Sequence, residues 1–155
     1  MTGEGGPEMG LTFRVREISV AVADIGRAAE TLSRVFLGDV DQVVDFPEEG
    51  LQLEMGGTWI GDFHVALVHD ASGQGPVGRF VERRGEGFFE LNVQTNDLPA
   101  AIAHCKRQGL RFLSEEPKIL RNYEWKGEVF SELRIVFLDP ATTHGVLIEL
   151  GEWVK

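Results

Sequence analysis

The stretch Glu17-Ile18-Ser19-Val20-Ala21-Val22 decides the fold, because it recurs later in the chain as Glu90-Leu91-Asn92-Val93-Gln94-Thr95. Each copy opens with a glutamate, continues with residues typical of a half-buried strand, and leads past an aspartate into an alanine-rich helical stretch. The aspartates are Asp24 and Asp97, and both pairs have the same separation, since 90 − 17 = 73 and 97 − 24 = 73. A repeat of this length exceeds a solenoid unit and indicates two copies of one half-domain.

Each half is predicted to run strand, helix and three further strands. Asp24 is a suitable N-cap, and Gly38 is the expected end of the first helix. Turn-forming residues are expected to separate the strands. In the first half the pattern predicts strands near 15–23, 40–46, 51–56 and 62–69, with turns at 47–50 and at Gly56-Gly57.

The second half is predicted to repeat this order after a link at 70–76 and a short helix over 77–84. Its pattern predicts strands near 88–95, 110–114, 130–138 and 145–150, a helix over 97–108 and an irregular segment at 118–128. The fold class is therefore α+β, with two tandem βαβββ modules forming a curled mixed sheet around a central cavity. The expected organisation is a flexible arm over 1–12 and a single domain over 13–155, with halves at 13–70 and 76–152.

Composition narrows the class of protein. Hydrophobic residues make up 43% of the 155 residues, which suits one globular domain, and no apolar run is long enough to cross a bilayer. The one cysteine, Cys105, and a start without signal-peptide character predict a cytoplasmic protein. The net charge of 15 − 25 = −10 argues against a nucleic-acid partner. A local cluster of Arg79, Arg83 and Arg84 still allows a small anionic ligand.

Several stretches resemble the vicinal oxygen chelate superfamily of glyoxalases, bleomycin-resistance proteins and dioxygenases, and are most similar to the methylmalonyl-CoA epimerases. The resemblance covers about residues 16 to 150. It is carried by Ile18–Val22 with Asp24-Ile25, Pro47–Leu51, Pro76–Gly87, Ser114–Lys118, and Phe137–Pro140 through Gly145–Leu150. It implies a small-molecule substrate, possibly an acyl-CoA, and a homodimer.

The family's metal ligands carry over to this chain only in part. By the resemblance, Glu17 and Glu90 occupy the positions where the family has two metal-binding histidines. Glu149 matches the family's glutamate ligand on the closing strand. The remaining ligand position falls on Ala66, which cannot bind a metal, but His64 lies two residues away on the same strand face. The metal set implied is therefore Glu17, Glu90, Glu149 and His64.

Three carboxylates on inward strand positions repel one another unless a proton or a cation lies among them. An oxygen-rich shell suits a divalent ion such as Mg²⁺, Mn²⁺ or Ca²⁺, with Co²⁺ a further candidate. The alternative is that the metal site has been lost and that the glutamates pair with arginines or face water.

The resemblance also assigns proton transfer to Glu48, and Glu149 is expected to face it across a bound carbon acid. The function predicted is a metal-assisted epimerase or isomerase that acts next to the carbonyl of an acyl-CoA or a similar 2-substituted oxo acid. The alternative is a metal-free protein that binds an antibiotic or metabolite. An aromatic cavity mouth is expected from Phe88, Phe89, Tyr123 and Trp125, with one of the two phenylalanines in the core.

Overall fold

The computed structural model describes residues 10–46 and 52–155 and divides the chain into two compact units. The first unit is Glu17–Glu90, and the second combines the chain up to Arg16 with Leu91–Lys155. The strands β1 (Phe13–Ala21) and β5 (Gly87–Thr95) each contribute residues to both units. No helix in the described ranges is long and apolar enough to cross a membrane.

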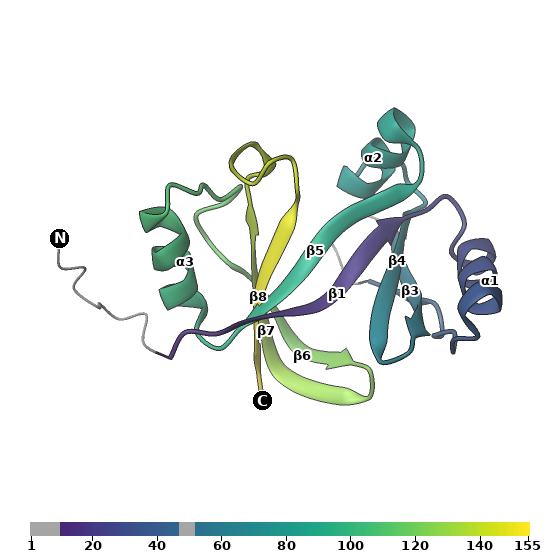
Figure 1. The fold of residues 1–155 in the computed structure, drawn as a ribbon, viewed down its shortest axis with the longest axis horizontal. Coiled ribbons are helices and arrows are strands. Elements are labelled where there is room, and N and C mark those ends of the chain that lie inside the picture. Colours follow the sequence, from purple (N-terminus) through teal and green to yellow (C-terminus); the bar gives the residue numbers. More distant parts are fainter. Residues whose placement is uncertain (1–9, 47–51) are drawn as a thin grey trace. The chain divides into compact units, whose positions relative to one another are not determined.

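The first unit is a strand–helix–three-strand module followed by a short helix (Figure 1). Its strands lie in the order β2-β3-β4-β1, with β1 parallel to β4 and the other neighbours antiparallel. Its remaining elements are α1 (Ile25–Phe36), β2 (Val44–Asp45), β3 (Leu53–Ile60), β4 (Phe63–Asp70) and α2 (Pro76–Arg84).

The second unit repeats the module with the same connectivity. Its strands lie in the order β6-β7-β8-β5, with β5 parallel to β8. Its elements after β5 are α3 (Leu98–Arg107), β6 (Lys118–Trp125), β7 (Glu128–Leu138), a short 3-10 turn (Pro140–Thr142) and β8 (Ile148–Val154). The predicted α+β class and the two βαβββ modules are therefore confirmed.

Matching aspartates start the two long helices. The Asp24 carboxylate accepts a hydrogen bond from the Arg27 backbone N–H at 2.9 Å, and the Asp97 carboxylate accepts one from the Ala100 N–H at the same distance. Each bond satisfies a backbone donor that the first helical turn leaves without a partner. The helix α1 ends at Phe36, and its C-cap is Leu37, which has a φ of 54° and lies one residue before the predicted glycine.

Each long helix covers one face of its sheet. In the first unit, α1 packs through Ile25 and Ala29 on Val20, Val22 and Leu67. In the second unit, α3 packs on the β7 and β8 side chains; this core consists of Leu98, Ala101, Cys105, Val136, Leu138 and Leu150. Burial raises the pKa of the Cys105 thiol.

Three element predictions were wrong. Gly56-Gly57 is not a turn but lies inside β3, whose hairpin turn is at Gly61-Asp62. The segment 118–128 is not irregular, because Lys118–Trp125 forms β6, an edge strand in which no residue is fully buried. The predicted strand at 110–114 is reduced to one bridge between Phe112 and Leu138.

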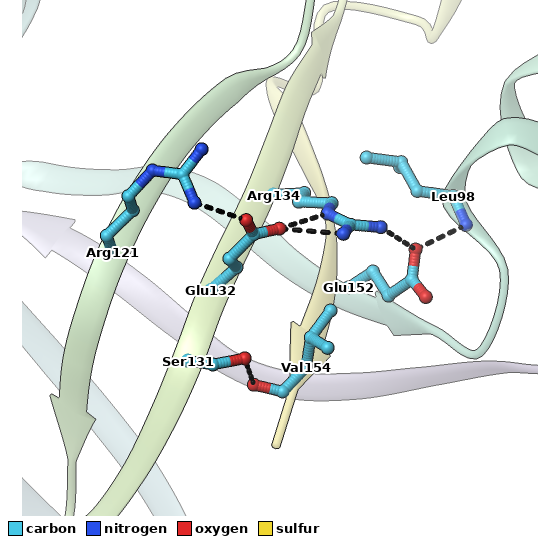
Figure 2. Close-up of polar contacts among 7 residues, drawn as sticks. All are labelled: Leu98, Arg121, Ser131, Glu132, Arg134, Glu152 and Val154. Carbon is cyan, nitrogen blue, oxygen red and sulfur yellow. Dashed lines mark hydrogen bonds and ion pairs between the residues drawn. The ribbon is translucent and has the colours of Figure 1, made fainter.

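A network of charged side chains lies on the face of the second unit's sheet that packs against α3 (Figure 2). The Glu132 carboxylate accepts hydrogen bonds from Arg121 at 2.6 Å and from Arg134 at 2.7 Å. Glu152 in turn accepts from the Leu98 backbone N–H at 3.1 Å, at the first turn of α3. The hydrogen bond from Arg134 holds the pKa of the Glu132 carboxyl below its usual range.

Candidate functional site

The first predicted site residue, Glu17, lies on the face of the first unit's sheet that α1 leaves uncovered. Side chains alternate along a strand, so Glu17, Ser19 and Ala21 oppose Val20 and Val22, which pack against α1. The far end of this face is apolar, because α2 packs there against Ala21. Glu17 therefore belongs to the polar end of the uncovered face.

At this polar end, Glu17 and His64 are in short contact. Nδ1 of His64 lies 2.5 Å from Oε2 of Glu17, and Nε2 of the same ring lies 2.6 Å from Oδ2 of Asp41. The side chains of Glu17 and His64 are 7% and 2% exposed, and that of Asp41 is 21% exposed. The imidazole is thus bonded on both nitrogens, to a buried carboxylate on one side and to a partly exposed one on the other.

Gly57 makes room for this ring. A Cβ added to Gly57 would lie 2.5 Å from Nε2 of His64 and 2.6 Å from the Val65 carbonyl oxygen, closer than real Cβ atoms come. The Trp59 ring flanks the imidazole with its centroid 5.0 Å away. The glycine that sequence reasoning assigned to a turn therefore serves a close approach inside a strand.

Glu90 also belongs to this polar end. It is buried, with 9% of its surface exposed, and its Oε1 accepts a hydrogen bond from the Ser19 hydroxyl at 3.3 Å. Ser19 is fully buried and shares its strand face with Glu17. Two of the predicted carboxylates and His64 are thus in the first unit.

Glu149 is in the second unit and occupies the corresponding strand face there. It precedes the buried Leu150, which packs against α3, so its side chain lies on the face without the helix. Its register partner on β5 is Asn92, whose amide donates a long hydrogen bond of 3.5 Å to Oε1 of Glu149.

Strand register shows how the two halves correspond. Ser19 pairs with Ala66 in the first half, and Asn92, which lies 73 residues after Ser19, pairs with Glu149 in the second. Ala66 is therefore the structural counterpart of Glu149. The first half lacks a carboxylate at that position and places an imidazole, His64, two residues earlier.

The predicted metal set is divided between the units, so the set as a whole stays a prediction. Glu17 and His64, however, are not arranged as ligands of a shared metal ion. A histidine ligand needs a free ring nitrogen, and both nitrogens of His64 are engaged with carboxylates. Among residues 10–46 and 52–155, no three His, Cys, Asp or Glu side chains are arranged to hold a metal ion.

The other predicted positions divide into three cases. Glu48 lies outside the described residues. Phe89 packs in the core against Phe80, whereas Phe88 is 48% exposed, so the expectation that one of the pair is core is confirmed. Trp125 stacks on the Arg16 guanidinium, with 3.9 Å from the guanidinium carbon to the ring centroid.

Sequence reasoning missed two residues of this site, Asp41 and Gly57. Asp41 lies between α1 and β2, within the range predicted as a strand near 40–46, and no sequence signal connects it with a histidine 23 residues later. Gly57 did carry a signal, because a glycine within a strand pattern indicates a close approach as well as a turn.

Residues 16–126 match the family described as the Glyoxalase/Bleomycin resistance protein/Dioxygenase superfamily. Human mitochondrial methylmalonyl-CoA epimerase is 25% identical over 140 residues, which cover 90% of this chain and 73% of the human protein.

Two solved structures are also similar to this chain. Methylmalonyl-CoA epimerase of Streptomyces coelicolor in complex with 2-nitronate-propionyl-CoA is 27% identical, with a TM-score of 0.71 over 92% of this chain and 98% of that one. A methylmalonyl-CoA epimerase in complex with methylmalonyl-CoA and NH4+ is 26% identical, with a TM-score of 0.70 over 90% and 94%.

Proposed function

We propose that this chain, which belongs to the Glyoxalase/Bleomycin resistance protein/Dioxygenase superfamily, is an epimerase that moves a proton at the carbon next to the carbonyl of an acyl-CoA. The observation that carries the proposal is the similarity to methylmalonyl-CoA epimerases along 90% of the chain. Buried or half-buried carboxylates on the helix-free faces of both sheets supply the chemistry that such a reaction needs.

In the proposed reaction, one carboxylate removes the α-proton and a second carboxyl group returns a proton to the opposite face of the carbon. Glu48 and Glu149 are assigned these roles, and Asn92 orients Glu149 through its amide. The intermediate is an enolate. Because one proton is removed and one is returned on the opposite face, the substrate keeps its composition and the configuration of its α-carbon is inverted.

Glu48→Gln is the direct test of the first role. Glutamine keeps the shape of the side chain but cannot accept the proton, so exchange of the α-proton with deuterated solvent should fall about 10²–10⁴-fold. Glu82→Gln, on an exposed position of α2, is the matched control and should exchange at the parent rate. A Glu48→Gln protein that exchanges as fast as the control would remove Glu48 from the mechanism.

The predicted divalent ion is tested separately, by metal analysis and by dialysis against a chelator. Because Glu17 and His64 do not fit a metal shell, the proton transfers are assigned to side chains alone, and exchange should survive dialysis. Loss of exchange on dialysis and its recovery with Mg²⁺, Mn²⁺, Ca²⁺ or Co²⁺ would restore the metal-assisted mechanism.

The second candidate is a metal-free protein that binds an antibiotic or metabolite. It is favoured by one observation, that Glu17 and His64 are bonded to each other and so do not supply two ligands to a metal. Calorimetric titration separates the two candidates: a binding protein would bind an acyl-CoA or a drug tightly without exchanging any α-proton. The cytoplasmic location and the homodimer stay predictions in both cases.

A further inference from the structure

The short helix α2 carries three arginines, Arg79, Arg83 and Arg84, in a chain whose net charge is −10. All three are exposed to solvent. Glu82 is the one acidic residue of the helix, so α2 has a net charge of 3 − 1 = +2. This group, the α2 arginines, is a local positive surface on an acidic protein.

The α2 arginines have no carboxylate partner, unlike several other exposed cations of the chain. Lys106, for example, forms an ion pair with Glu115 at 3.0 Å. Within residues 10–46 and 52–155, no ion pair involves an α2 arginine. Glu86, which follows the helix, accepts a hydrogen bond from the Ala23 backbone N–H at 2.8 Å instead. The charge of the α2 arginines is therefore not paired within the described part of the chain.

Helix α2 buries one side and presents the arginines on the other. Val77 is buried against the first unit's sheet, whereas Arg79 and Arg83 are exposed one helical turn apart. Like charges at this spacing destabilise a helix, so packing gives no reason for the pair. The helix dipole favours cations in the last turn, which accounts for Arg83 and Arg84 but not for Arg79.

Two of the α2 arginines are held in place by neighbouring groups. Nη1 of Arg79 donates a hydrogen bond to the backbone oxygen of Gln74, and the Arg84 guanidinium carbon lies 5.9 Å from the centroid of the Phe80 ring. Side chains that are already ordered lose less conformational entropy when a ligand binds. A guanidinium also presents paired N–H groups that match two oxygens of a phosphate. The α2 arginines therefore have the charge and the donors to bind phosphate groups.

We propose that the α2 arginines bind the phosphate groups of the coenzyme A portion of the substrate, an inference that rests on the proposed function for the identity of the ligand. Coenzyme A carries a diphosphate and a ribose phosphate at its adenosine end, and a flexible pantetheine arm separates these groups from the thioester. Recognition of the phosphates therefore needs no contact with the residues that move the proton. The α2 arginines are binding residues, and no step of the reaction is assigned to them.

Calorimetric titration tests this site without any turnover. The parent should bind coenzyme A more tightly than dephospho-coenzyme A, which lacks the ribose phosphate, and pantetheine, which lacks every phosphate, should bind most weakly. Arg79→Gln combined with Arg83→Gln should weaken coenzyme A binding about tenfold or more and leave pantetheine binding unchanged, because charge-assisted hydrogen bonds are lost. Arg83→Lys keeps the charge but not the paired donors, so its affinity should fall between those of the parent and Arg83→Gln.

Arg34→Gln is the matched control. Arg34 is an exposed arginine of α1 that is ion-paired with Glu30, and its replacement changes the net charge of the chain by the same amount as Arg83→Gln. This variant should bind coenzyme A as the parent does, and unfolding curves show whether each variant is folded. Parent affinity in the double variant would overturn the site, as would an equal loss of affinity in Arg34→Gln and Arg83→Gln.

A lipid headgroup is a second source of phosphate groups. Sedimentation with phosphatidylglycerol vesicles separates the two sources. If it depends on the α2 arginines while the parent binds coenzyme A no more tightly than pantetheine, the coenzyme A assignment is overturned.

The outcomes for this site and for the proposed function are separate. Parent protein that binds coenzyme A through the α2 arginines but exchanges no α-proton would remove the epimerase and keep the site. Normal exchange by the parent, together with unchanged coenzyme A affinity in the double variant, would remove the site and keep the epimerase.

Discussion

The two halves of this chain have the same connectivity but different groups at equivalent strand positions. On β4 of the first half, alanine stands at position 66 and histidine at 64; on β8 and the residue before it, the counterparts are Glu149 and Leu147. The first half thus encloses a carboxylate–imidazole–carboxylate chain, whereas the second half presents one carboxylate beside an amide. A repeated backbone therefore fixes where polar groups lie, and the side chains decide what each half can do.

The largest expected effect on the free energy of unfolding comes from filling the space that the His64 ring occupies in the first half. Gly57→Ala should lower the free energy of unfolding by about 1–3 kcal/mol, because the new methyl group meets both the His64 ring and a backbone oxygen. Urea denaturation measures the change. The second half has leucine, Leu147, at the strand position that matches His64, and needs no such glycine there.

Gly26→Ala is the control for Gly57→Ala. Gly26 is exposed on α1, and its nearest atom to an added Cβ is 3.5 Å away, so alanine should raise the free energy of unfolding by about 0.5–1 kcal/mol. Equal effects of the two substitutions would show that Gly57 does not provide the space for His64.

The next effect is one that both halves should share. Asp24→Ala and Asp97→Ala each remove a hydrogen bond of 2.9 Å to a helix N-terminus, and each should cost about 0.5–2 kcal/mol of unfolding free energy. Thermal unfolding of the two variants tests the repeat directly. A normal cost for one cap and none for the other would break the equivalence of the halves.

The smallest effect depends on pH and concerns Asp70, at the end of β4. Burial alone raises the pKa of this carboxyl, but hydrogen bonds from the Ser72 hydroxyl and from the Gly75, Ser72 and Gly73 backbone outweigh it and lower the pKa below the ordinary 3.8. A lowered folded-state pKa adds stability above the ordinary pKa, and this stability is lost as the pH falls through the folded-state value.

Asp70→Asn should therefore lower the free energy of unfolding at neutral pH by about 1 kcal/mol and weaken its fall in acid. Asp139→Asn in the second half should also weaken the fall of the unfolding free energy in acid, because hydrogen bonds from the Ala141 backbone and Arg111 lower the pKa of that carboxyl. Denaturant titrations above and below pH 4 provide the measurement, and parallel curves for parent and variants would contradict it.

The sequence predicted the features that depend on local chemistry and on the repeat. The 73-residue offset predicted two βαβββ modules, and the residue types at Asp24 and Asp97 predicted the helix starts. β6 was missed because an edge strand buries little, so its residues lack a clear alternation. Asp41 could not be predicted, because its partner His64 is brought to it only by the fold.

Solvent-deuterium exchange decides whether this chain transfers a proton at the carbon next to an acyl-CoA carbonyl, as proposed. Methylmalonyl-CoA is incubated in D₂O with parent protein, with Glu48→Gln and without protein, and mass spectrometry follows its α-position. Deuterium should enter with the parent at a rate far above the protein-free rate, and about 10²–10⁴-fold more slowly with the variant. Parent protein that binds methylmalonyl-CoA yet leaves its α-proton unexchanged would rule out the proposed epimerase and identify a binding protein.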